Sequence, residues 1–154
     1  MSPEIWEKIP DFHDYSVSNY GRVRRDSKRS ERYHGYLGIP YMLKPIHNAH
    51  GYLTVSLFGS SANNSSAHGV RRQTIKRRVH RLVLEAFIGH QTNPTNHRDG
   101  NKQNNSLENL EYTTPKENSA HAIRLGLIAS GERHPLAKLT KRKVREIRQR
   151  LRQG

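Results

Sequence analysis

The sequence predicts an α+β fold, in which an antiparallel β module precedes a strand–strand–helix unit and a basic helix follows. Alternating apolar residues over 4–58 predict the β module, and a helix-start pattern at the end of the asparagine-rich stretch 96–118 predicts the middle unit. A run of Lys and Arg near the end predicts the last helix. The expected domain boundaries are 1–78, 79–130 and 131–154.

The amino-acid composition excludes several classes of protein and of binding site. The chain has 154 residues, of which 32% are apolar, so its core must be thin. It contains no cysteine, which excludes disulfides and thiolate metal sites and leaves oxygen or imidazole ligands for any metal. No apolar run is long enough to span a membrane, and no secretory leader is visible. The formal net charge of +14 is clustered, which favours a polyanionic partner over a merely soluble basic protein.

The β module shows two strand signals. Two short strands, one with Val17 and one with Val23, are expected on either side of the turn 19–21. A further strand, 53–57, has its apolar residues on one face and follows a His-Gly turn. The polar segment 59–69 is typical of a flexible hairpin tip. The stretch RRQTIKRRVHR behind it is a basic stripe suited to phosphate contacts.

The middle of the chain predicts a helix and then a hairpin. The segment HRLVLEAFIG (80–89) has an apolar stripe at helical spacing, and Gly89 can end the helix. Asp99-Gly100 is a turn signal between two short extended segments. The second of these segments is anchored by apolar residues: Leu107, Leu110 and Tyr112.

Two more helices are expected after the hairpin. Thr114 as N-cap, Pro115 at the first helical position and Glu117 as the partner in a capping box predict a helix that runs to about Leu125. Thr140 can cap the last helix, which has a narrow apolar stripe of Val144, Ile147 and Leu151. Its charge is so one-sided that contact with DNA is favoured over a merely solvated helix.

The stretch 96–118 gathers amides around one imidazole. Hydrolysis of a phosphodiester needs a base for the attacking water and a cation for the charge that develops on the phosphate. Histidine has the unperturbed pKa nearest neutrality, so His97 can accept a proton at working pH. Amide oxygens are hard ligands suited to Mg²⁺, Mn²⁺ or Ca²⁺. A hairpin followed by a helix can bring Asn96 and Asn118 together, and Asn118 shares a helix face with His121.

The ordered segments HRLVLEAF, NHRDGNKQNN, LENLEYTTPKEN and HAIRLG resemble the HNH endonucleases of phages and mobile introns, over about residues 80–127. YSVSNYGRVRR, preceded by Trp6, resembles the nuclease-associated modular domain found beside such nucleases. The resemblance implies a β-rich DNA-binding module, a ββα-metal (HNH) catalytic domain and a partial helix-turn-helix-like segment. It also implies a metal-dependent, homing-type DNA endonuclease that works through a His-activated water.

Residue by residue, the resemblance makes His97 the general base and Asn109 the asparagine that positions it. Asn96 and Asn118 match the metal-ligand positions, and His121 is a secondary ligand. Relatives often carry Asp or His where Asn96 stands, so the protein without DNA should bind metal weakly. The expected cofactor is Mg²⁺ or Mn²⁺.

The remaining polar residues of this region have blander interpretations. Asp99, Asn101, Asn104 and Asn105 are expected to serve in turns and loops. His80 is expected either to contact the DNA backbone or to hold the site together.

The expected partner is double-stranded DNA, bound by a monomer that nicks one strand per site, in the host-cell cytoplasm if a phage encodes the protein. The predicted DNA contacts are Arg71, Arg72, Lys76, Arg77, Arg78, His80, Arg81, Arg98, Lys102, Lys141, Arg142, Arg145 and Arg148. The main alternative is a DNA-binding protein with an inactive nuclease fold. A basic structural or RNA-binding module is the other, and the sequence lacks aromatic stacking motifs for it.

Overall fold

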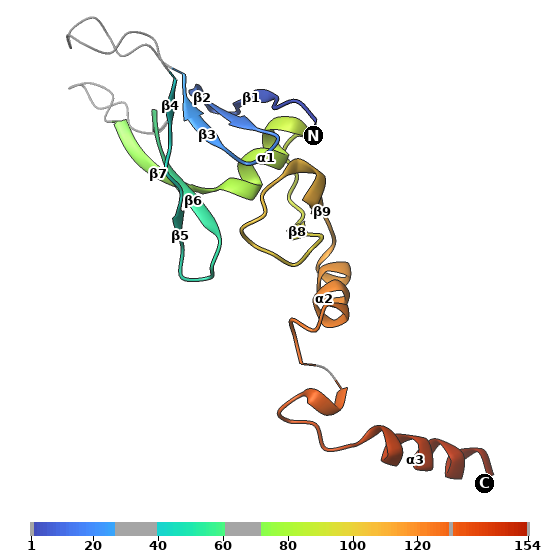
Figure 1. Ribbon diagram of the computed structural model, residues 1–154. Helices are drawn as coiled ribbons and strands as arrows, with labels where there is room; N and C mark the ends of the chain where they lie inside the picture. Colours follow the sequence, from blue (N-terminus) through green and yellow to red (C-terminus); the bar gives the residue numbers. More distant parts are fainter. Residues whose placement is uncertain (1, 27–39, 61–71, 130, 154) are drawn as a thin grey trace, which may run out of the picture. The chain divides into compact units, whose positions relative to one another are not determined.

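A computed structural model describes residues 2–26, 40–60, 72–129 and 131–153 (Figure 1). They fall into two compact units, divided after Thr113. Strands prevail in the first unit and helices in the second, which confirms the predicted α+β class. The first unit contains both the predicted β module and the strands of the predicted catalytic domain. The boundaries expected at 78 and 130 stay a prediction.

The first sheet is antiparallel, with its four strands in sequence order. They are β1 (Trp6–Ile9), β2 (Phe12–Ser18), β3 (Val23–Arg25) and β4 (Tyr41–Met42). The predicted turn joins β2 to β3, and Val17 pairs with Val23 across it, as expected. On this sheet the guanidinium carbon of Arg24 lies 4.2 Å from the centroid of the Trp6 ring, a cation–π contact.

The second sheet has the order β5–β6–β7. These strands are β5 (Ile46–His47), β6 (Leu53–Ser60) and β7 (Arg72–Arg78), and β6 confirms the strand expected over 53–57. The predicted hairpin tip falls mostly on residues 61–71, outside the described part of the chain. Strand β7 runs directly into α1 (Val79–Phe87), whose N-cap is Arg78.

One apolar core joins both sheets to α1. Alternation along β2 and β6 turns one face of each strand inward, and the apolar stripe of α1 covers them. The Tyr15 hydroxyl of the first sheet accepts a hydrogen bond from the Phe58 backbone N–H of the second, at 3.2 Å. The core residues are Ile9, Phe12, Tyr15, Val17, Val23, Val55, Leu57, Val79, Leu82, Val83, Leu84 and Leu110.

The last of these core residues belongs to a small hairpin. Strand β8 (Thr95–His97) pairs antiparallel with β9 (Leu110–Tyr112), and His97 lies opposite Leu110. The predicted return strand is shorter than expected, because Leu107 belongs to a 3-10 turn, η1 (Leu107–Asn109), ahead of β9. The long loop between β8 and η1 carries three asparagines: Asn101, Asn104 and Asn105.

The second unit consists of α2 (Pro115–Arg124), a 3-10 turn η2 (Gly131–Arg133) and α3 (Lys141–Gln153). The predicted capping box is confirmed: Thr114 Oγ1 accepts from the Glu117 N–H, and the Glu117 side chain accepts from the Thr114 N–H. The side chain of Thr140 accepts from the Lys143 N–H at the start of α3, which confirms that cap too. Among the residues described, no helix is long and apolar enough to cross a membrane.

Candidate active site

The imidazole of His97 is buried and held on two sides. It lies at the end of β8 and is 5% exposed. The Tyr52 ring lies against it with centroids 6.0 Å apart, and the His80 ring meets it edge-on at 5.1 Å. Both neighbours come from the predicted β module and α1, so the core of the first unit fixes the ring.

Asn105 hydrogen-bonds this imidazole. Its Oδ1 lies 3.2 Å from His97 Nε2, while its Nδ2 donates to the Gln103 carbonyl at 3.1 Å. Because an amide oxygen only accepts, Nε2 must carry the proton, which leaves Nδ1 as the acceptor in the neutral ring.

The environment of His97 keeps the ring neutral. Burial lowers the pKa of the imidazole, and the charge of Lys102 acts in the same direction. The hydrogen bond with Asn105 and the charge of Asp99 oppose them without reversing the shift. A neutral ring with a lone pair on Nδ1 can accept a proton near pH 7, as a general base must.

Asn109 holds the loop rather than touching the ring in this structure. Its Nδ2 donates to Asp99 Oδ1 at 2.9 Å and to the Asn104 carbonyl at 2.8 Å, and its Oδ1 accepts from the Asp99 N–H at 3.0 Å. The Arg98 N–H donates to its carbonyl at 2.8 Å. Asn109 therefore closes the loop that follows His97, and a role in positioning the histidine would act through that loop.

The predicted metal ligand Asn96 is 7% exposed and has a fixed amide. Its Nδ2 donates to Glu111 Oε1 at 2.9 Å, so Oδ1 points away from Glu111. Arg98 Nε donates to the other Glu111 oxygen at 3.0 Å. An amide oxygen held in a fixed orientation is a suitable ligand for a hard cation such as Mg²⁺ or Mn²⁺. The described ranges hold no cluster of three His, Cys, Asp or Glu side chains suited to a metal, so amide donors would be central.

The other two predicted ligands lie in the second unit. Asn118 and His121 stand three residues apart on α2, and both are partly buried. That spacing gives them one helix face, as the sequence predicts. The joining of Asn96 and Asn118 around one cation stays a prediction.

His80 is 3% exposed and lies inside the first unit. Burial, and then the charges of His97, Arg78 and Arg81, lower the pKa of His80 to about 3. The predicted contact with the DNA backbone does not fit this position, because a buried neutral ring offers a phosphate neither surface nor charge. Its edge-on contacts with the rings of Tyr52 and His97 favour the alternative role, which is support of the site.

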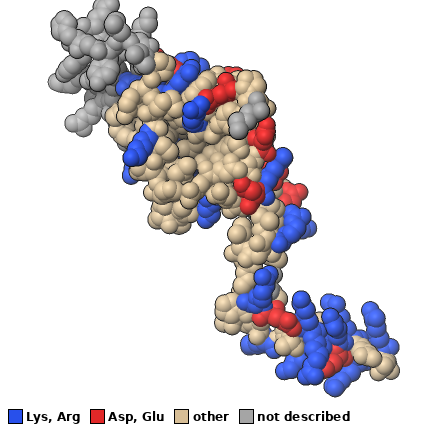
Figure 2. Space-filling view, viewed as in Figure 1, with Lys and Arg blue, Asp and Glu red and all other residues tan. Residues whose placement is uncertain are grey.

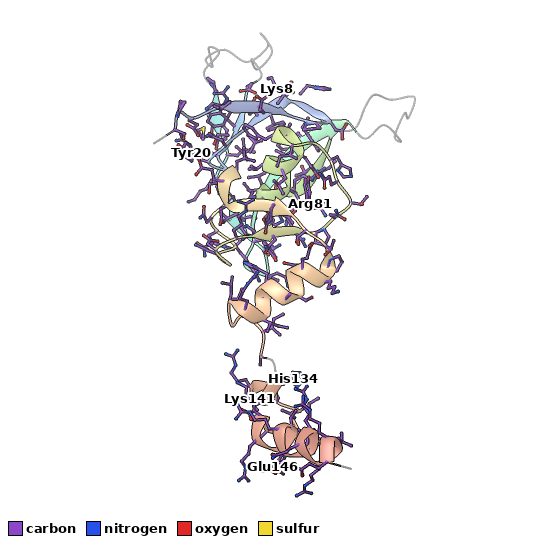
Figure 3. The ribbon with its side chains drawn as sticks, turned by 90° about the vertical axis from the view of Figure 1, so that its right-hand side faces the viewer. Lys8, Tyr20, Arg81, His134, Lys141 and Glu146 are labelled. Atoms are coloured by element: carbon purple, nitrogen blue, oxygen red, sulfur yellow. The ribbon has the colours of Figure 1, made fainter. Side chains whose placement is uncertain are left out.

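The predicted DNA-contacting residues of the first unit divide into two groups. Lys76, Arg78 and Lys102 are exposed, and the last two lie over the Tyr52 ring. Lys102 Nζ also donates to the His50 carbonyl at 3.0 Å. Arg77 is engaged inside the protein, since its Nη2 lies 2.5 Å from the buried Glu85 carboxylate. The other paired members are Arg81, labelled in Figure 3, which donates to the Gln91 carbonyl, and Arg98, which donates to Glu111. Arg71 and the side chain of Arg72 lie outside the described residues.

In the second unit the predicted contacts all lie on α3. Figure 2 shows Lys and Arg gathered over this helix. The predicted residues Lys141, Arg142, Arg145 and Arg148 are exposed, and Glu146 is the one acidic residue of the helix. Such a surface can contact a phosphate backbone at several points.

Sequence reasoning missed three residues beside the predicted ones. Asn105 was expected to serve only in a turn, and neither Tyr52 nor Glu111 was singled out. Their contacts depend on tertiary packing rather than on helix or strand spacing, so the local sequence carries little signal of them. The pattern Asn96–Glu111, two cross-strand partners in β8 and β9, becomes visible only once the register is known.

Comparisons with known proteins match both parts of the chain. Residues 4–58 match the NUMOD4 motif, and residues 77–120 match the HNH endonuclease family. A protein of Acanthamoeba polyphaga mimivirus, named uncharacterized HNH endonuclease L245, is 38% identical over 124 residues, or 79% of this chain and 31% of its own. The Bacillus subtilis (strain 168) prophage-derived protein YosQ, whose name places it with HNH homing endonucleases, is 48% identical over 66 residues, or 40% of this chain and 38% of its own.

A solved structure of the HNH homing endonuclease I-HmuI, described in terms of DNA binding and cleavage, is also similar. It matches with a TM-score of 0.57 and 26% identity, over 94% of this chain and 66% of that one. The chain spans only about a third of the length of the two sequence relatives.

Proposed function

Because the chain belongs to the HNH endonuclease family and carries a NUMOD4 motif ahead of the HNH region, we propose that it is a metal-dependent DNA endonuclease of the homing type. One observation carries the proposal beyond the family: the buried, neutral His97 imidazole, oriented with Nε2 donating and Nδ1 accepting. A nuclease needs this state of the ring if histidine is to activate water.

In the proposed reaction His97 Nδ1 takes a proton from a water molecule. The water oxygen forms a bond to the scissile phosphorus, the bond to the 3′ oxygen breaks, and that oxygen takes up a proton. The products are a 5′-phosphate and a 3′-hydroxyl. Asn109 supports the step by closing the loop behind His97 through Asp99 and Asn104.

Asn96, Asn118 and, as a secondary ligand, His121 are the proposed metal-binding side chains. A divalent cation, when bound there, would supply positive charge for the phosphate and the departing 3′ oxygen. Glu111 fixes the amide of Asn96 so that an oxygen rather than a nitrogen is offered. Mg²⁺ and Mn²⁺ suit these ligands equally well.

Double-stranded DNA is the proposed substrate, held by exposed cations of both units. Lys76, Arg78 and Lys102 supply them in the first unit and α3 in the second. One His97 per chain can activate one water at a time, so a monomer should nick one strand.

The test is cleavage of supercoiled plasmid by the full chain with Mg²⁺, Mn²⁺ or EDTA. We expect open-circle product with either metal and none with EDTA. His97→Ala should lower the rate by about 10²- to 10⁴-fold without weakening DNA binding, because general-base catalysis has that magnitude. His13→Ala is the matched control, since His13 is an exposed histidine of β2.

Two results would overturn the proposal. Unchanged cleavage by His97→Ala would remove this histidine from the chemistry. DNA binding without cleavage in any metal would leave an inactive nuclease fold that serves as a DNA-binding protein.

A further inference from the structure

We infer that Asn105 is a positioning residue for His97, and that the turn between β2 and β3 of the N-terminal sheet holds Asn105 in place. Asn105 is 4% exposed and lies in the loop between β8 and η1. The contacts of Asn105 described below are observed in the structure, whereas their effect on catalysis rests on the proposed function.

The first step is the orientation of the Asn105 amide. Its Nδ2 donates to the Gln103 carbonyl at 3.1 Å, and this bond turns Oδ1 toward His97 Nε2. The opposite orientation would aim an N–H₂ group at the ring and favour the proton on Nδ1. Asn105 therefore selects which imidazole nitrogen carries the lone pair.

The second step is the backbone of Asn105, which packs against Gly21. A Cβ added at Gly21 would lie 2.7 Å from Asn105 Cβ and 2.8 Å from its carbonyl oxygen. Gly21 also has φ +76°, a conformation that side chains with a Cβ rarely adopt. Only glycine meets both requirements at this point.

The turn is fixed on both sides of Gly21. The Leu107 N–H donates to the Asn19 carbonyl at 2.8 Å, which ties the asparagine loop to the turn. The Asn19 side chain accepts from the Ile5 N–H at 2.9 Å and so anchors the turn to the N-terminal segment. Tyr20, in the middle of this turn, is labelled in Figure 3.

It follows that the N-terminal sheet is part of the support of the active site. A change at Gly21 or Asn19 reaches His97 through the backbone of Asn105 and then through its amide. This role is separate from any contact that the sheet makes with DNA.

The experiment reads the His97 ring directly, by ¹⁵N NMR of the two imidazole nitrogens in the full chain without DNA. In the wild type we expect the neutral form with the proton on Nε2. Asn105→Ala should give a mixture of the two tautomers, and Asn105→Asp, which keeps an acceptor oxygen, should retain the proton on Nε2. Gln103→Ala is the control, because it removes an exposed amide two residues away and keeps the backbone carbonyl to which Asn105 donates.

Plasmid cleavage is the second readout. Asn105→Ala should lower kcat by about 10- to 100-fold, as loss of a supporting hydrogen bond does, with KM and DNA affinity unchanged. An unaltered His97 spectrum in Asn105→Ala overturns the inference whatever happens to cleavage. An altered spectrum together with full activity of His97→Ala would instead uphold the positioning and overturn the proposed function.

The turn is tested with Gly21→Ala and, as a milder variant, Asn19→Ala. Gly89→Ala is the matched control, since Gly89 has φ +106° and a Cβ there meets no described heavy atom within 4 Å. Both glycine variants should lose stability, but only Gly21→Ala should alter the His97 spectrum. Asn19→Ala, which keeps the backbone free of clashes, should broaden the same signals. An unchanged spectrum in folded Asn19→Ala would contradict the part played by the turn.

Discussion

The loop around His97 and helix α3 are both polar, yet the protein uses their polar side chains in opposite ways. His97, Asn96 and Asn105 are nearly buried, and the amide of each asparagine has a protein partner. On α3 no residue is buried, and its cations face solvent. The first arrangement fixes the positions of the polar atoms, as proton transfer requires, whereas the second provides charge that needs no fixed position.

The largest expected difference between the two regions is in stability. Leu84→Ala, in the core beneath the site, should lower the free energy of unfolding by about 2–5 kcal/mol, because it leaves a cavity at a fully buried position. Ile147→Ala on α3, where the side chain is 45% exposed, should change it by no more than about 0.5 kcal/mol. Urea unfolding followed by circular dichroism measures both. Equal losses would show that α3 packs against something that stabilises it.

Removal of charge from α3 is the second comparison. Replacing Arg142, Arg145 and Arg148 together by Ala should lower DNA affinity by up to about a hundredfold near physiological salt, because each lost phosphate contact removes about 0.9 from the slope of log K against log salt. The cleavage rate at saturating DNA should stay unchanged. Affinity is measured over a salt series, with Gln149→Ala as the control on the same helix. A changed rate at saturation would mean that α3 contributes to chemistry.

The pH dependence of stability is the third comparison, and its effect is spread over several pH units. The pKa of His80 is about 3 in the folded protein against an ordinary value of 6.5, mainly because of burial. The unfolded chain therefore binds a proton below pH 6.5 that the folded chain refuses until about pH 3. Stability from this residue is intact above pH 6.5 and falls toward pH 3, by up to about 1.4 kcal/mol per pH unit.

His80→Phe keeps a ring at this position and cannot bind the proton. The unfolding free energy of wild type and of His80→Phe is measured at several pH values from 7 to 4. As the pH falls, the wild type should lose stability relative to His80→Phe. A difference independent of pH would mean that His80 is not neutral in the fold.

Features that depend on neighbouring residues could be predicted from the sequence. Thr114 and Glu117 form the capping box, with Pro115 at the first helical position, because all the atoms involved belong to four consecutive residues. Val17 and Val23 pair because the tight turn between their two short strands determines the register in which the strands pair. The apolar spacing of α1 likewise determines which of its faces is buried.

Features that depend on tertiary packing rather than on helix or strand spacing could not be predicted. The Arg77–Glu85 ion pair, the burial of His80 and the bond from Asn105 to His97 each need the tertiary arrangement. Among so many asparagines, composition gave no means of choosing the one that faces the imidazole. The close packing of Asn105 against Gly21, far away in the sequence, sets Asn105 apart from the other asparagines.

The contact between Arg24 and Trp6 makes the N-terminal sheet optically distinguishable. The chain has one tryptophan, so tryptophan fluorescence reports on the surroundings of that ring alone. The Arg24 guanidinium carbon lies 4.2 Å from the centroid of the Trp6 ring. When the first sheet unfolds, the ring loses this neighbour and is exposed to water, so the tryptophan emission should change. Melting of α2 and α3 should leave it unaltered while circular dichroism at 222 nm falls. Intrinsic fluorescence and dichroism together thus separate the unfolding of the two units without any added label.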